Sequence, residues 1–219
     1  MVSRKYFKNN LITDACIGDF VHELFIKVYL EYNTALCNSI DNLQAKKQLI
    51  KHKRNFYNYI LIDSKLLYRI VDSFNTSILG LRPISIEDII NFKKAIIYIG
   101  KGKKERRNIH INEASSILGG TLNKRSEKFT KILKIWRKGG GIVVLQIQSD
   151  SDHYLALCRE NAMIQATGKA LLTNINNGSV YGLMKNKWTF PEILNFGEML
   201  LYFSLQKCII ERPYPHIPR

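Results

Sequence analysis

Three short runs of aliphatic, β-branched and aromatic residues stand between much longer stretches of helical periodicity. They are Phe56–Asp63, residues 95–99 and residues 142–147; Gly100 stops the second run and three consecutive glycines precede the third. Runs of this length, bounded by glycine or polar residues, predict β-strands. Because a sheet of three short strands must bury its faces against other elements, we expect an α/β (α+β) domain in which helices flank a small sheet.

The remaining stretches with regular apolar spacing predict helices. They cover residues 12–40, 86–93, 105–118, 125–138, 152–168 and 191–208. Ser85 and Asp88 have the spacing of a capping box, which predicts where the second of these helices begins. The lysine-rich residues 44–54 are typical of a solvated helix face rather than of a binding site.

The balance of charge indicates a polyanionic partner. Lysine and arginine number 33 against 18 acidic residues, which gives a formal net charge of +15. Nucleic acid is therefore the first partner to expect. No apolar stretch approaches the roughly 20 residues that span a bilayer, so we expect no membrane partner. The charge pattern says nothing about oligomeric state.

The cysteines indicate a reducing environment. Cys16, Cys37, Cys158 and Cys208 lie far apart without a CxxC pair, which argues against both a zinc knuckle and a disulfide framework. We expect buried, reduced thiols. Polar residues interrupt any signal-peptide core near the N-terminus, so an intracellular location, nuclear or cytoplasmic, is expected.

Residues suited to a functional site lie at the end of the second predicted strand and after it. They comprise Tyr98-Ile99-Gly100-Lys101-Gly102, then Arg106, His110, Glu160 and Asn174. The glycines and lysine of this run lack the Gly-Lys-Ser/Thr ending of a nucleotide-binding loop, which excludes that interpretation. A strand that ends in Tyr-Ile-Gly-Lys, before a helix bearing an arginine and then a histidine, resembles the second half of the GIY-YIG nuclease signature.

Within that superfamily, the chain resembles in particular the nuclease domains of eukaryotic proteins that also carry ankyrin repeats and a LEM domain. The residues that carry the resemblance lie at 98–103, 110, 113–114, 131–136, 159–162, 172–174 and 181–182. Neither ankyrin repeats nor a LEM domain can be recognised before Phe56. The resemblance implies a GIY-YIG-like fold with a mostly antiparallel three-stranded sheet and extra helices at both ends.

The resemblance also implies a set of site residues. They are Tyr59, Tyr98, Lys101, Arg106, His110, Glu160 and Asn174. Tyr59 takes the place of the first-strand tyrosine, although the usual Gly-Ile-Tyr triplet is absent. Glu160 is the implied ligand of Mg²⁺ or Mn²⁺, and we favour it over Glu113, which we expect to support His110.

Phosphodiester hydrolysis needs these kinds of side chain. Arg106 is suited to a forked contact with the scissile phosphate and Lys101 to a nearby point charge. Tyr98 or Tyr59 is the candidate general base, provided that neighbouring cations lower the pKa of its phenol. His110 either orients or deprotonates the water or positions a tyrosine. Asn174 is either a site residue or a turn residue.

We therefore expect a metal-dependent DNA endonuclease that prefers branched or distorted DNA. The expected organisation is a helical N-terminal extension over residues 1–54, the nuclease domain over 55–183, and a C-terminal helical extension over 184–219 packed on it. Two other interpretations stay open. One is a catalytically inactive, basic nucleic-acid-binding module, and the other is a GIY-YIG nuclease of a mobile or viral element.

Overall fold

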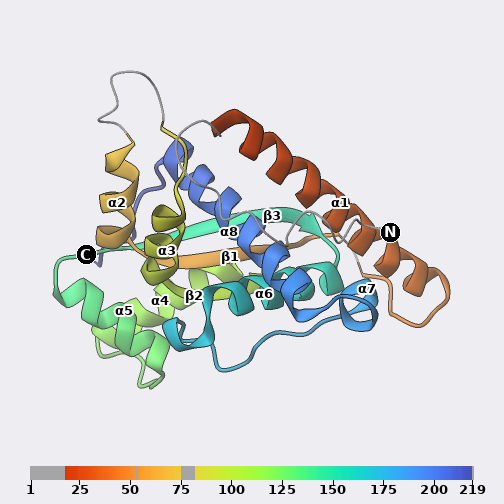
Figure 1. Ribbon diagram of the computed structural model, residues 1–219. Helices are drawn as coiled ribbons and strands as arrows, with labels where there is room; N and C mark the ends of the chain where they lie inside the picture. The colour runs from red at the N-terminus through yellow and green to blue at the C-terminus, as the bar shows by residue number, and fades with distance from the viewer. Residues whose placement is uncertain (1–17, 53, 75–81, 219) are drawn as a thin grey trace.

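A three-stranded sheet runs through the middle of the molecule (Figure 1). The computed structural model describes residues 18–52, 54–74 and 82–218. Strand β1 (Phe56–Asp63) lies between β2 (Ile96–Gly102) and β3 (Ile142–Ser151), and it pairs antiparallel with both. The predicted strands and the mostly antiparallel sheet are thus confirmed.

Helices surround this sheet on both faces. Their bounds are α1 Gly18–Ala45, α2 Ser64–Ser73, α3 Ile86–Ala95, α4 Arg106–Leu118, α5 Glu127–Arg137, α6 His153–Thr167, a 3₁₀ turn Lys169–Leu171, α7 Gly182–Asn186 and α8 Phe190–Glu211. Each predicted helix is present to within a few residues, and the part of the first that precedes residue 18 lies outside the described residues. Helices α2 and α7 were not predicted.

The prediction of a helix face across residues 44–54 was wrong. Helix α1 ends at Ala45, and residues 46–52 and 54, which the structure describes, form turns, bends or irregular chain. The turn closes through backbone bonds from Gln48 and Leu49 to the carbonyl of Leu43. A run of lysines indicates solvation whether or not the backbone is helical, so charge alone could not place this boundary.

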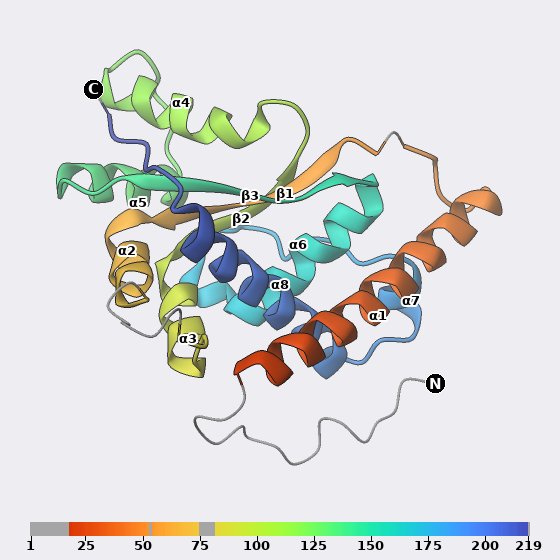
Figure 2. The same ribbon diagram turned by 90° about the horizontal axis from the view of Figure 1, so that it is seen from above.

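Strand alternation divides the buried side chains into two clusters. Tyr57, Tyr59 and Leu61 of β1 face α4 and α5, where they pack with residues such as Phe129 and Ile132. Figure 2 shows α4 on one side of the sheet and α2, α3, α6 and α8 on the other. The sheet is therefore covered on both faces.

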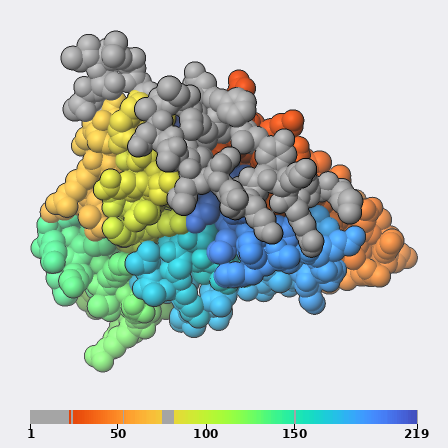
Figure 3. Space-filling view, viewed as in Figure 1, coloured from red at the N-terminus to blue at the C-terminus, as the bar shows by residue number. Residues whose placement is uncertain are grey.

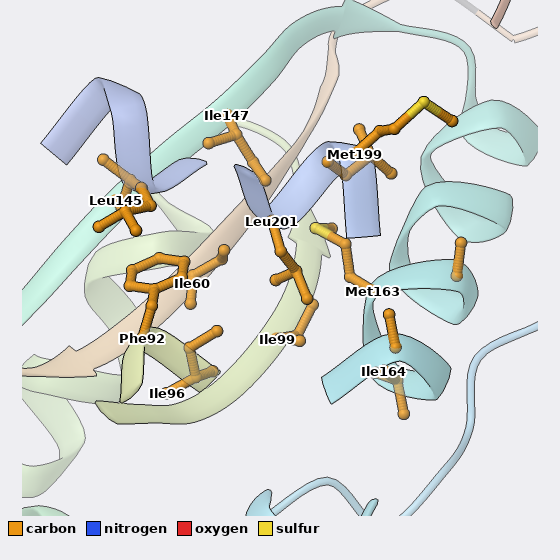
Figure 4. Packing of buried hydrophobic residues seen from close by; sticks show 14 of the residues in the cluster. Ile60, Phe92, Ile96, Ile99, Leu145, Ile147, Met163, Ile164, Met199 and Leu201 are labelled. Atoms are coloured by element: carbon orange, nitrogen blue, oxygen red, sulfur yellow. The ribbon is translucent and has the colours of Figure 1, made fainter. Parts of the chain in front are cut away.

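The larger cluster lies on the face covered by α1, α2, α3, α6 and α8. Ile60 of β1 and Ile99 of β2 meet Leu201 of α8 and Met163 of α6 there (Figure 4). These side chains are 0 % exposed. Removal of this much aliphatic surface from water is the main force that holds the helices to the sheet.

Helix α8 comes closer to a membrane span than its sequence suggested. It has 22 residues and is long and apolar enough to cross a bilayer, contrary to the expectation that no stretch approaches that size. Half of its apolar window is nevertheless buried inside the protein. Leu200, Leu201 and Leu205 are at most 1 % exposed within the core, which is the packing of a core helix.

The segment between α4 and α5 extends away from this body. In the space-filling view it projects from the lower edge as a light-green extension (Figure 3). Most of its side chains are exposed, including Lys124 and Arg125. Positive charge is therefore displayed beside the end of α4.

The cysteines of the described part of the chain are free thiols, as expected. Cys158 and Cys208 are buried and Cys37 is partly buried. Cys16 lies outside the described residues. Burial raises the pKa of Cys158 and of Cys208 to about 12, so both stay protonated.

Candidate active site

Four of the predicted site residues line one open cavity. Tyr98 and Lys101 come from β2, Arg106 begins α4, and Glu160 lies on α6. The cavity has a volume of about 340 Å³, and Phe56, Gly102 and Lys103 complete its lining. A larger cavity of about 540 Å³, beside Trp136, is lined by no lysine, arginine or acidic residue. The charged side chains of the predicted site thus line the smaller cavity.

The two glycines of β2 allow aromatic and charged side chains to approach the strand closely. A Cβ atom on Gly100 would lie 2.7 Å from the Cζ and hydroxyl of Tyr59 and 2.7 Å from Cε1 of Tyr98. A Cβ on Gly102 would lie 2.9 Å from that of Arg106. The backbone dihedrals of Gly100 and Gly102 are not left-handed, so backbone conformation does not require glycine there. The close contacts of an added Cβ atom do.

Tyr59 lies beneath the cavity rather than in it. Its side chain is 0 % exposed, and its hydroxyl lies 2.9 Å from Nε2 of His110. The ring of His110 in turn meets that of Tyr98, at 5.2 Å between centroids. The structure therefore brings Tyr59 and His110 together with Tyr98, but only Tyr98 reaches the cavity.

Lys128 of α5 completes this group. Its ammonium lies 3.0 Å from Nδ1 of His110 and 4.2 Å from the centroid of the Tyr98 ring. Burial lowers the pKa of Lys128 to about 8, so the ammonium form still predominates at neutral pH. A cation over the electron-rich face of Tyr98 holds that ring in place.

His110 is neutral at physiological pH. Burial, followed by the charge of Lys128, lowers the pKa of His110 to about 4. Glu113, whose carboxylate is 3.7 Å from Nδ1, opposes this shift but is itself paired with Lys124 at 2.6 Å. The ammonium of Lys128 lies 3.0 Å from Nδ1 and 3.2 Å from Nε2, and it can only donate a hydrogen bond to the ring. His110 thus links the hydroxyl of Tyr59 to the ammonium of Lys128.

Glu160 is a partly buried carboxylate among cations. Burial raises its pKa to about 7, while Lys101 and Arg106 lower it. Burial likewise raises the pKa of Tyr98, with Glu160 the next cause, while a hydrogen bond with Tyr59 and the charge of Arg106 oppose the rise. A cation bound to Glu160 would stabilise its carboxylate form and would cancel the charge by which Glu160 raises the pKa of Tyr98.

The side chain of Arg106 is exposed to solvent at the cavity. Tyr57 fixes its backbone: the tyrosine hydroxyl donates to the carbonyl of Lys104 at 2.6 Å and accepts from the N–H of Arg107 at 3.1 Å. The start of α4 is thereby tied to β1. An exposed guanidinium on an anchored backbone is suited to hold a phosphate.

Asn174 does not line the cavity. Its side-chain amide donates to the carbonyl of Ile99 at 2.7 Å and accepts from the N–H of Ile99 at 3.0 Å. The amide thus imitates a neighbouring strand at the point where β2 carries Tyr98 and Gly100. Thr173 adds a backbone bond to Ile97 at 2.9 Å. Asn174 therefore holds the strand that bears the site.

The donor set suits a divalent cation that is shared with substrate. Among the described residues no group of three or more His, Cys, Asp and Glu side chains gathers to enclose a metal. Glu160 alone offers a carboxylate in the cavity. A hard cation such as Mg²⁺ commonly takes one or two protein carboxylates and completes its shell with water and phosphate. The residues present therefore fit such a group, with Glu160 as its protein ligand.

Sequence reasoning missed three residues around the site: Lys128, Tyr57 and Phe56. Lys128 follows the N-cap Ser126 on a surface helix, and only tertiary packing brings it to His110. Tyr57 and Phe56 lie in the predicted strand, and its alternation did place Tyr57 on the same face as Tyr59. Its position on the same strand face as Tyr59 was the sequence feature that could have identified Tyr57.

Comparison with known proteins identifies the family of the chain. A family model described as the LEM-3-like GIY-YIG domain matches residues 56–217. The ankyrin repeat and LEM domain-containing protein 1 of Homo sapiens is 30% identical over 151 residues, which cover 66% of this chain and 24% of that protein. Its Mus musculus counterpart is 30% identical over 155 residues, covering 69% and 27%.

The Caenorhabditis elegans homolog is 26% identical over 159 residues, which cover 72% of this chain and 21% of that protein. The chain thus spans about a quarter of the length of these relatives. No solved structure matches it significantly. The suspected resemblance is confirmed: the chain belongs to the LEM-3-like GIY-YIG family, within the GIY-YIG nucleases.

Proposed function

We propose that this domain is a divalent-metal-dependent DNA endonuclease. The observation that carries the proposal is the convergence of Tyr98, Arg106 and Glu160, from three different elements, on one open cavity. A phenol, a guanidinium and a carboxylate together supply a proton acceptor, a phosphate anchor and a metal ligand. The net charge of +15 supports a nucleic acid as substrate.

Arg106 binds the scissile phosphate, and Lys101 adds a second positive charge on the same wall of the cavity. His153 holds Lys101 there, with 3.3 Å between Nζ and Nδ1. A divalent cation bound by Glu160 would neutralise charge on the phosphate oxygens. Both cationic side chains act most strongly as negative charge accumulates on the phosphate.

Tyr98 takes the proton from the attacking water. Oxygen of that water forms a bond to phosphorus, while the bond from phosphorus to one ester oxygen breaks and that oxygen receives a proton from solvent. Tyr98 is favoured over Tyr59 as the base because it lines the cavity, whereas Tyr59 is fully buried beneath it. Burial and then the charge of Glu160 raise the pKa of Tyr98, while the hydroxyl of Tyr59 and the charge of Arg106 oppose the rise. A cation held by Glu160 would remove the second cause and so favour the deprotonated form of Tyr98.

We further propose a preference for branched or distorted DNA. Support comes from the resemblance to the LEM-domain relatives and from the shape of the site, which is an open cavity of about 340 Å³ with an exposed arginine at its wall.

The experiment is cleavage of a four-way junction, a fork and a linear duplex of the same sequence, each with Mg²⁺, with Mn²⁺ or with EDTA. We expect cutting only with a metal, and faster cutting of the junction or fork. Equal rates on all three substrates would refute the preference alone. Binding without any cutting would make the domain an inactive binding module.

A further inference from the structure

One wall of the candidate cavity is aromatic. Phe56, the first residue of β1, lines the cavity beside Lys101 and Lys103 and is partly exposed. No step of the proposed hydrolysis uses an apolar side chain. The presence of this ring among charged groups therefore calls for a separate explanation.

Two histidines brace the ring of Phe56 from its sides. The His153 ring lies 4.9 Å from it at an interplanar angle of 71°, and the His52 ring lies 6.3 Å from it at 78°. Rings that meet near the perpendicular are in edge-to-face contact, so neither imidazole is stacked parallel on the ring of Phe56. Among the described residues, no aromatic side chain is stacked parallel on Phe56.

Positive charge gathers over the same ring. The ammonium of Lys101 lies 5.1 Å from the ring centroid and that of Lys103 lies 5.8 Å from it. Burial, and then the charge of Lys101, lowers the pKa of His153, so this imidazole is neutral and accepts a hydrogen bond from Lys101. An aromatic ring with cations around it is the arrangement that binds a single-stranded nucleotide. The nucleotide's phosphate would draw the two ammonium groups off the ring, and its base would take their place on it.

We propose that Phe56 stacks an unpaired nucleobase next to the scissile phosphate, while Lys101 and Lys103 contact the phosphates on either side of that base. The inference rests on the proposed nuclease function and deepens it. Bases inside a duplex are already stacked on both faces, whereas branched or distorted DNA offers a base whose face is free. A cavity of about 340 Å³ can hold such a base with its phosphate. Phe56 thereby determines substrate preference and takes no part in the chemistry.

The test is a cycle of two changes, one in the protein and one in the DNA. The DNA is a fork whose single-stranded arm carries, at the four nucleotides next to the junction, either thymidines or abasic residues. The proteins are wild type, Phe56→Leu and Phe56→Trp, with Phe190→Leu as a control at an exposed phenylalanine of α8. Cleavage is measured as kcat/KM with Mg²⁺. Binding is measured in parallel in the Glu160→Gln background.

Removal of the bases should weaken binding by wild type about 5- to 100-fold, the range of one base–aromatic stack. Phe56→Leu should lose the same factor on the thymidine arm and nothing further on the abasic arm. Phe56→Trp should keep the preference, and Phe190→Leu should behave as wild type. If Phe56→Leu weakens both arms equally, or neither, the stacking role is refuted.

The two proposals fail in different ways. If wild type cuts the fork but Phe56→Leu shows no dependence on the bases, the nuclease proposal stands and the stacking proposal falls. If wild type does not cut any DNA, the nuclease proposal falls, and the binding cycle alone still decides whether Phe56 stacks a base. The urea midpoint of each variant reports whether the fold is intact.

Discussion

At the scale of single residues, the site depends on close packing around β2. Gly100 could be predicted from the sequence as part of a Tyr-Ile-Gly run, and the structure supplies its reason, which is the passage of the Tyr59 ring beneath it. Lys128 could not be predicted, because nothing near it in the sequence indicates a contact with His110. Contiguous motifs can be read from one sequence; contacts between helices cannot.

Gly100→Ala should destabilise the protein and reduce cleavage. The added methyl group would lie 2.7 Å from atoms of Tyr59 and Tyr98, so both rings must shift. We expect a loss of about 1–3 kcal/mol in the free energy of unfolding, measured in urea. Gly119→Ala is the matched control, since its methyl group would meet only the Ser115 carbonyl at 3.5 Å. Equal stability of the two variants would contradict the packing argument.

Burial of His110 should make stability depend on pH. The pKa of His110 in the folded protein is about 4, below the ordinary value of 6.5, so the unfolded chain binds this proton more tightly. Stability that is present above pH 6.5 is therefore lost as the pH falls toward 4.

We expect the loss between pH 7 and pH 4, measured by urea unfolding, to be smaller in His110→Gln than in wild type. His216→Gln, at an exposed position, should lose as much as wild type. A loss in His110→Gln as large as that of wild type would show that His110 is not a buried neutral imidazole.

At the scale of elements, the strands and most helices follow from composition and periodicity. Helix α2 escaped prediction because it begins directly where β1 ends: Asp63 closes the strand, and its carboxylate caps the helix by accepting from the N–H of Lys65 at 2.9 Å. No linker marks the change. The sequence left two roles open for Asn174, a site residue or a turn residue. Its side chain instead makes a pair of hydrogen bonds to the backbone of Ile99, which is a third role.

Asn174→Ala should loosen β2. The change leaves the buried N–H and carbonyl of Ile99 without their side-chain partner, which costs about 1–3 kcal/mol for an unsatisfied group. We expect this loss in thermal or urea unfolding and, because Tyr98 moves with the strand, a fall in kcat with little change in DNA affinity. The control is Asn176→Ala, at an exposed position of the same loop. A variant with unchanged stability would show that Asn174 does not hold the strand.

At the scale of the whole molecule, the sheet, α6 and α8 form one core. Residues of α8 belong to the same buried cluster as β1, β2 and β3, and the family match runs to residue 217. The charge of +15 is a property of the whole chain, and it indicated the class of substrate before any site was visible. Sequence patterns could not show that β2, α4 and α6 meet at one cavity, because that meeting depends on tertiary packing.

The central claim is that Glu160 and Arg106 act on one DNA phosphate in the cavity that Tyr98 also lines. The most direct measurement is nicking of supercoiled plasmid and cutting of a branched duplex by wild type, Glu160→Gln and Arg106→Ala, with DNA binding followed in parallel. The account predicts that wild type cuts only with Mg²⁺ or Mn²⁺, and that both variants bind DNA but cut at least about 100-fold more slowly, as for loss of a transition-state contact. Cutting by Glu160→Gln at the wild-type rate would contradict it.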